Sequence, residues 1–142
     1  MLVNDVMSKH VISVSPDESL AVAARLLSRY NVGMLPVCNA EQKLKGVLTD
    51  RDIVLRCVAT GADPAKARVH QAMTGRVVSV NPTDPAVVAT SLMAKEQVRR
   101  LPVEQNGRLV GMVSLADLAQ LPDYSAETAD ALSEICSNVQ SR

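Results

Sequence analysis

Aromatic residues are almost absent from this chain of 142 residues, which has no phenylalanine, no tryptophan and only two tyrosines. A sandwich of aromatic rings around a planar ligand is therefore nearly excluded. A flat base bound by this chain would have to lie between aliphatic side chains such as valine, isoleucine, leucine and methionine. Backbone hydrogen bonds would then fix its position.

An excess of charge of either sign is also lacking, because 15 basic residues are balanced by 15 acidic ones. The chain therefore has no overall basic field that would attract nucleic acid or an anionic membrane surface. No apolar run approaches the roughly 18 residues that span a bilayer, and the first residues do not resemble a secretory signal. These features predict a soluble, cytoplasmic protein without nucleic-acid or membrane partners.

Cysteine and histidine are scarce as well. Cys38, Cys57 and Cys136 are odd in number and match neither a metal knuckle nor a redox pair, so we expect buried or partly buried free thiols. His10 and His70 are expected to be ordinary surface residues. Because a nucleophile, a metal site and an acid–base pair are all lacking, the sequence predicts no enzymatic activity, no metal site and no catalytic cofactor.

What the chain does contain is an internal repeat. The run Met7–Pro16 returns 66 residues later as Met73–Pro82, and Leu35-Pro36-Val37 returns as Leu101-Pro102-Val103. Beyond these triplets the offset falls to 65, so one residue has been lost. Two copies of one supersecondary unit usually stack to bury a face that neither buries alone. Any binding site is therefore expected to occur as a pseudo-symmetric pair.

Each copy opens with a short run rich in β-branched residues, Val11–Val14 or Val77–Val80, which predicts a strand. A helix start signal follows, because Ser15 can cap a helix, Pro16 suits its first position and Glu18 completes a capping box. Apolar residues then recur at helical spacing in both copies. These stripes comprise Leu20, Ala23, Ala24, Leu27 and Tyr30 in the first copy, and Val88, Leu92 and Met93 in the second.

Two short strands and a short helix complete each copy. Asn106-Gly107 joins the second pair of strands and predicts a tight hairpin turn, because this dipeptide tolerates positive φ angles. The predicted strands span residues 34–38, 44–48, 101–104 and 109–113, and the short helices span 50–58 and 115–121. The sequence thus predicts an α+β fold in which two β-α-β-β-α repeats pack with pseudo-two-fold symmetry into one module.

The repeats also define a domain organisation. We expect a first repeat at residues 1–58, a linker at 59–68 with the glycine, aspartate and proline of a connector, and a second repeat at 69–121. Residues 122–142 are expected to form a C-terminal helix, whose apolar stripe needs a partner in the chain's own core or in a second subunit. That stripe comprises Ala129, Leu132, Ile135, Cys136 and Val139.

Both copies contain a turn in which a strand runs into a helix through a hydroxyl residue followed three residues later by aspartate. The pairs are Thr49 with Asp52 and Ser114 with Asp117. In one interpretation the hydroxyl caps the helix and the carboxylate binds free backbone amides. In the other, the carboxylate accepts hydrogen bonds from two neighbouring ribose hydroxyls. The two interpretations are compatible, because a carboxylate has spare lone pairs.

Taken together, these features make the chain resemble the cystathionine β-synthase (CBS) domain family. The resemblance rests on the tandem repeat, the Met-Ser/Thr opening, the Leu-Pro-Val strand and the Gly-x-x-Thr/Ser-x-x-Asp turn, and it covers nearly the entire chain. Two CBS repeats form a Bateman module, which is usually a regulatory domain that binds adenosine compounds in clefts between the repeats. Many such modules dimerise, so the resemblance implies a homodimer.

The resemblance also implies two related ligand sites. Asp52 and Asp117 would each hold a ribose, with Thr49 and Ser114 beside them. The base would rest near aliphatic side chains, which agrees with the shortage of aromatic residues. These side chains are Val11 and Ile12 or Val77 and Val78, together with Val47 or Met112.

Phosphate groups would need cations, which the two copies supply unequally. Arg99 and Arg100 precede the second Leu-Pro-Val triplet, where the family often places phosphate-contacting basic residues. Guanidinium groups can bind phosphate oxygens in a bidentate fashion. The first copy has Gly33 and Met34 there, and Arg51 is its nearest obvious cation. The first site is accordingly weaker, unphosphorylated, empty, or completed by an arginine from the other repeat.

The function favoured by these features is a regulatory sensor that binds an adenine nucleotide. AMP, ADP, ATP, NAD and S-adenosylmethionine all carry the adenosine portion that the two sites would read. Occupancy would be passed to an unidentified regulated protein through a change of conformation or of the dimer. The alternative is a ligand-independent module for structural dimerisation and assembly, in which the turn residues only cap helices.

Overall fold

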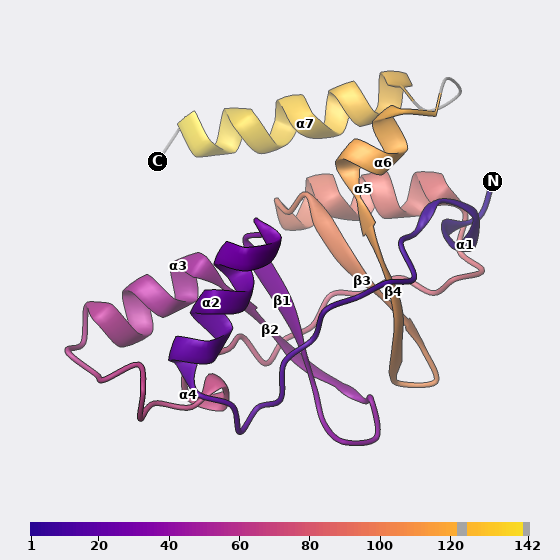
Figure 1. Ribbon diagram of the computed structural model, residues 1–142. Helices are drawn as coiled ribbons and strands as arrows, with labels where there is room; N and C mark the ends of the chain where they lie inside the picture. The colour runs from indigo at the N-terminus through magenta and orange to yellow at the C-terminus, as the bar shows by residue number, and fades with distance from the viewer. Residues whose placement is uncertain (122–124, 141–142) are drawn as a thin grey trace. The chain divides into compact units, whose positions relative to one another are not determined.

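The computed structural model describes the backbone of residues 1–121 and 125–140, and the side chains of residues 1–121 and 126–137 (Figure 1). The chain forms two compact units. One is Ile12–Val77, which we call the first-repeat unit; the other joins Met1–Val11 to the chain from Val78 onward, and we call it the second-repeat unit. The opening segment of each repeat, residues 1–11 or 69–77, therefore lies in the unit built around the other repeat.

The first-repeat unit is an antiparallel hairpin with helices packed against it (Figure 1). Its elements are α2 (Leu20–Tyr30), β1 (Met34–Cys38), β2 (Leu44–Thr49), α3 (Asp50–Ile53), the π-helical turn η1 (Val54–Val58) and α4 (Val69–Ala72). Side chains from all of these elements form one buried cluster, so the hairpin and its helices share a single core. The most deeply buried members include Leu20, Leu35, Val37, Leu48, Cys57 and Val69.

The second-repeat unit repeats this arrangement and adds a long helix. Its elements are α1 (Val3–Val6), α5 (Ala86–Glu96), β3 (Arg100–Gln105), β4 (Arg108–Ser114), α6 (Leu115–Ala119) and α7 (Ser125–Gln140). Its core cluster includes Val3, Met93, Leu101, Val103, Val113 and Leu118. The two units thus confirm the predicted α+β class, the four strands of the two hairpins and the short helix after each hairpin.

The turn between β3 and β4 is the tight turn that the sequence predicts. Asn106 and Gly107 have φ angles of 55° and 81°, as a two-residue hairpin turn requires. The turn between β1 and β2 is longer, and there Asn39 Oδ1 accepts hydrogen bonds from the backbone N–H groups of Glu41 and Lys43. The extra residue of the first copy therefore lies in a turn that the Asn39 side chain closes.

The opening strand predicted in each copy is reduced to a single parallel bridge, so the prediction of strands at 11–14 and 77–80 was too long. Val14 donates to Pro36 O at 3.0 Å and accepts from Cys38 N at 3.0 Å. The next parallel hydrogen bonds on either side would need the N–H groups of Pro36 and Pro16, which prolines lack. The second copy is limited in the same way at Val80, by Pro102 and Pro82.

The start of the first long helix also differs from the prediction. α2 begins at Leu20, and Ser19 rather than Ser15 is its N-cap, with Ser19 Oγ accepting from Val22 N at 3.2 Å. The N–H groups of Leu20 and Ala21 donate to carbonyls of residues 67 and 64 at 2.9 Å, so the linker satisfies the exposed helix end. Of the predicted stripes, Tyr30 and Val88 are exposed, and the others are buried or half-buried.

α7 packs against α5 and α6 within the second-repeat unit (Figure 1). Ala131 and Ile135 join the core cluster, so this helix finds its apolar partner in the chain's own core. Of the predicted stripe, Ile135 is buried and Cys136 half-buried as expected, whereas Ala129 and Leu132 are exposed and Thr128 and Ala131 are buried one position before them. The predicted stripe residue Val139 lies outside the described side chains.

The cysteines and histidines behave as expected from their spacing. All three cysteines are free thiols, with Cys38 and Cys57 buried and Cys136 half-buried. His10 and His70 are exposed. Within residues 1–121 and 125–140, no helix has the length and apolar character needed to cross a membrane.

Candidate functional site

In each unit, the exchanged opening segment runs across the second strand of the hairpin and pairs with it. Val47 of β2 exchanges hydrogen bonds with Thr74, at 3.0 and 2.9 Å. Met112 of β4 makes the same pair of bonds with Ser8, at 2.9 and 2.8 Å. These crossings bring the opening segment of one repeat to the strand that leads into the other repeat's Thr/Ser-x-x-Asp turn.

The crossings explain the glycine that opens each of these turn motifs. A Cβ atom at Gly46 would lie 2.6 Å from the carbonyl oxygen of Thr74. At Gly111 it would lie 2.7 Å from Met7 Sδ and 2.9 Å from the carbonyl oxygen of Ser8. Such approaches are shorter than van der Waals contact, so only glycine lets the segment cross the strand. The sequence shows the glycines and the Met-Ser/Thr openings, but not that they meet.

The boundaries between the two units fall within both pairs of residues that were predicted to contact the base. Val11 belongs to the second-repeat unit and Ile12 to the first, whereas Val77 belongs to the first and Val78 to the second. Val11, Val77 and Val78 are half-buried, and Ile12 is exposed over 37% of its surface. The segment that ends at Val77 therefore crosses the strand of the Asp52 turn, and the segment that ends at Val11 crosses that of the Asp117 turn.

Both Thr/Ser-x-x-Asp turns form complete capping boxes, which confirms the capping interpretation. Thr49 Oγ1 accepts from Asp52 N and Asp52 Oδ2 accepts from Thr49 N, each at 3.0 Å. The corresponding distances for Ser114 and Asp117 are 3.1 and 3.4 Å. Each cap employs Oδ2, so Oδ1 of each half-buried carboxylate is available for another partner.

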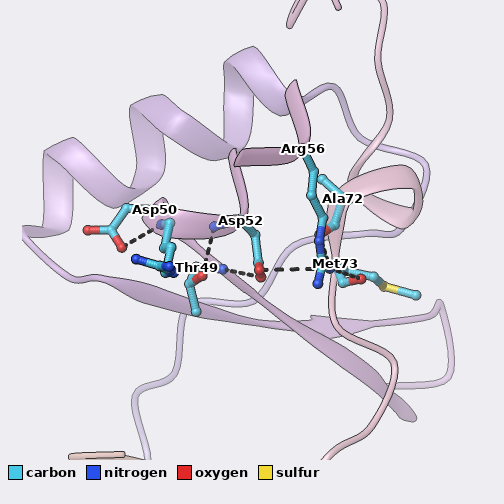
Figure 2. Close-up of polar contacts among 7 residues, drawn as sticks. Thr49, Asp50, Asp52, Arg56, Ala72 and Met73 are labelled. Carbon is cyan, nitrogen blue, oxygen red and sulfur yellow. Dashed lines mark hydrogen bonds and ion pairs between the residues drawn. The ribbon is translucent and has the colours of Figure 1, made fainter. Parts of the chain in front are cut away.

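The two aspartates differ in what lies next to Oδ1. Arg56 Nη1 lies 3.8 Å from Asp52 Oδ1 and also donates to the carbonyl oxygens of Ala72 and Met73, at 2.9 and 3.2 Å (Figure 2). Among the described residues, no cation lies within ion-pair distance of Asp117. Arg56 was not among the residues predicted from the sequence, although its spacing of four residues from Asp52 on a predicted helix indicates that the two side chains can meet.

The predicted phosphate-binding arginines of the second copy lie beside a cavity of about 420 Å³. Arg99 is held at the turn by its own backbone, because its carbonyl oxygen accepts from Leu115 N at 2.8 Å. Helix α7 closes one side of the cavity with Thr128 and Leu132. The remaining lining consists of Arg100, Ser114, Leu115, Ala116 and Ala119.

In the first-repeat unit, the position that aligns with Arg99 is Gly33, and the carboxylate of Asp50 lies beside it. There Gly33 O accepts from Asp50 N at 3.0 Å, and a Cβ atom at Gly33 would lie 3.6 Å from Asp50 Oδ2. Arg51, the predicted cation of this site, is exposed, and its backbone N–H donates to Asp50 Oδ1 at 2.8 Å. A carboxylate thus lies beside the position at which the second-repeat unit has Arg99.

Comparison with known proteins relates this geometry to solved structures. The chain is 43% identical over 129 residues to the CBS domain-containing protein YhcV of Bacillus subtilis, with 89% of this chain and 91% of that protein covered. The CBS domain pair of protein MJ0100, solved with 5′-methylthioadenosine and S-adenosyl-L-methionine, superposes with a TM-score of 0.75 at 28% identity, covering 88% of this chain and 98% of that one.

The structure of Hypoxic Response Protein I with two coordinated zinc ions gives a TM-score of 0.80 at 36% identity, covering 86% of this chain and all of that one. In the part of the present chain that the structure describes, no three His, Cys, Asp or Glu side chains are grouped to hold a metal ion. The family model for the CBS domain matches residues 3–58 and again residues 69–123. This protein is therefore a member of the CBS-domain family, with two CBS repeats in one chain.

Proposed function

We propose that this protein is a regulatory module that binds an adenosine-containing nucleotide and passes its occupancy on to a partner. The observation that carries the proposal is the turn of the second-repeat unit. There a carboxylate with an uncommitted oxygen, Asp117, and two arginines adjoin the same strand-to-helix turn, which borders a cavity of about 420 Å³. The two adenosine compounds bound by the related MJ0100 CBS pair support this assignment.

The roles follow from the chemistry of each group. Asp117 would accept hydrogen bonds from the two ribose hydroxyls through Oδ1, while Oδ2 keeps its bond to Ser114 N. Arg99 and Arg100 would bind phosphate oxygens. Aliphatic side chains of the crossing segment and of β4, among them Val11 and Met112, would flank the base. Asp52, Thr49 and Val47 would form the second, related site with Val77.

Ligand binding would be signalled by a change in the position of α7. Because Thr128 and Leu132 of α7 line the same cavity as the arginines, a phosphorylated ligand there would favour one position of α7 over others. That change would reach an unidentified regulated protein or alter a homodimer. We place this activity in the cytoplasm, where adenine nucleotides are available and free thiols such as Cys38 and Cys57 stay reduced.

A ligand-independent assembly module is the second candidate. The complete capping boxes favour it, since they explain Thr49, Asp52, Ser114 and Asp117 without any ligand. It predicts a stable dimer whose melting temperature does not change with nucleotide.

The decisive experiment is a thermal melt of nucleotide-free protein with adenosine, AMP, ATP, NAD or S-adenosylmethionine in large excess. A ligand at about 100 times its dissociation constant adds roughly 2.7 kcal/mol of stability, which raises the melting temperature of a protein this size by several degrees. The Arg99→Ala/Arg100→Ala variant should reduce the shift with AMP or ATP much more than the shift with adenosine. No shift with any compound would favour the assembly module.

A further inference from the structure

Arg56 is the best-anchored cation near either aspartate turn. It lies on η1, one helical turn after Asp52, and the Nη1 atom alone makes the contacts with Asp52, Ala72 and Met73 (Figure 2). The two carbonyls belong to the last residue of α4 and to its C-cap, where helix carbonyls have no partner within the helix. The guanidinium is thus fixed in place by the crossing segment itself.

The rest of the guanidinium remains available. Among the described residues, Nη2 and Nε make no hydrogen bond, and half of the Arg56 side chain is exposed. On another side, Arg56 lines a cavity of about 420 Å³ in the first-repeat unit, together with the cation Lys66, the amide of Gln71 and the carboxylate of Asp63. A preorganised guanidinium with free donors beside an open cavity is suited to bind phosphate oxygens.

Among the described residues of the second-repeat unit, no arginine takes the corresponding place beside Asp117. At the offset of 65 that aligns Asp52 with Asp117, Arg56 aligns with Leu121, which packs against the core. Conversely, Arg99 and Arg100 align with Gly33 and Met34 in the first copy. Each copy therefore has its own source of positive charge at the turn, placed on a different element.

We propose that Arg56 is the phosphate-binding residue of the Asp52 site and sets its preference for phosphorylated over unphosphorylated adenosine compounds. This inference rests on the proposed function, in which Asp52 holds the ribose. The Asp52 site thereby needs no arginine from the other repeat, and Arg51 serves no role in it. A ligand phosphate would bind through Nη2 and Nε while Nη1 keeps the carbonyls of Ala72 and Met73.

The test measures the affinities of AMP and adenosine by calorimetry in a background of Asp117→Asn with Arg99→Ala and Arg100→Ala, which weakens both ribose and phosphate binding at the other site. In Arg56→Gln, the affinity for AMP should fall by about tenfold or more relative to adenosine. Arg56→Lys should keep part of the preference, because an ammonium still attracts phosphate. Lys45→Gln removes an exposed cation of the same unit and controls for the change in net charge.

A purely structural Arg56 would weaken AMP and adenosine alike, and this result would overturn the inference. Loss of the AMP preference in Arg51→Gln instead of Arg56→Gln would overturn it too, by assigning the phosphate to Arg51. If the parent protein bound adenosine and AMP with equal affinity, Arg56 would have no phosphate role, although the proposed function would stand. Binding of neither compound to the wild type would remove both.

Discussion

The two units of this protein share a hairpin, a crossing segment and a capped aspartate, yet they surround that aspartate with different charges. In the first-repeat unit, Asp52 has Arg56 beside its free oxygen, and Asp50 lies over Gly33. In the second-repeat unit, Asp117 has no such cation among the described residues, and Arg99 lies where the first unit has glycine. The two turns thus share one backbone conformation, while the charged side chains around the aspartate differ between the units.

The difference shows that the turn motif alone does not define a ligand. Thr/Ser-x-x-Asp is sufficient to cap a helix, and both copies do so with one carboxylate oxygen. What the other oxygen can bind depends on side chains from η1, from the start of β3 and from the crossing segment. A tandem repeat can therefore hold two sites of unequal preference with the same backbone.

The largest expected effect concerns α7, which only the second-repeat unit has. Ile135→Ala should destabilise the protein by about 2–5 kcal/mol, because Ile135 is 4% exposed and packs in the core of that unit. Hydrogen exchange should accelerate most in α5 and α6. Leu132→Ala is the control, since Leu132 is 40% exposed. Equal acceleration in α2 and α3 would show that the units do not respond separately.

The second prediction compares the two aspartates directly. Asp117→Asn should weaken adenosine binding by about 1.5–3 kcal/mol, the contribution of hydrogen bonds to a charged group. Asp52→Asn should have a smaller effect, because Arg56 already balances the charge of Asp52. The amide oxygen of asparagine can still accept from the backbone N–H of the N-cap residue, so both variants should remain folded. Calorimetric titration of each variant checks the order, and a larger loss in Asp52→Asn would reverse it.

The third prediction concerns the two glycines at the crossings. Gly46→Ala should cost about 1–3 kcal/mol of unfolding free energy, because its Cβ would meet a backbone oxygen at 2.6 Å. Gly111→Ala should cost somewhat less, since its backbone contact with Ser8 O is longer, at 2.9 Å, and its nearest contact at 2.7 Å is the flexible Met7 side chain. Urea unfolding measures both values. Gly75→Ala is a control with no atom within 4 Å of the new Cβ.

The smallest effect is a difference in thiol reactivity. Burial raises the pKa of the Cys38 thiol, although a hydrogen bond with Ser13 partly opposes this, so little reactive thiolate forms at neutral pH. Half-buried Cys136 on α7 should react with a maleimide first. Cys38 should react faster only as the pH rises toward its raised pKa. Mass spectrometry of labelled peptides gives the order, and early labelling of Cys38 would contradict it.

Much of this architecture could be predicted from local patterns. The hairpins, the Asn106-Gly107 turn and the capped aspartates follow from alternation, turn residues and cap spacing, which act over a few residues. The opening strands were overestimated because β-branched residues favour strands, whereas the prolines of the neighbouring segment limit the pairing to one bridge. The partial displacement of the α7 stripe reflects packing against α5 and α6, which helical periodicity alone does not set.

The sequence by itself determined that there are two copies, where their turns lie and which side chains can carry charge, since these depend on short-range chemistry. Only the tertiary structure decided that each opening segment crosses the other repeat's strand, over Gly46 or Gly111. It also decided that Arg56, sixteen residues before Ala72, lies against its carbonyl. Both contacts join segments far apart in the chain, and their formation depends on the packing of the whole unit.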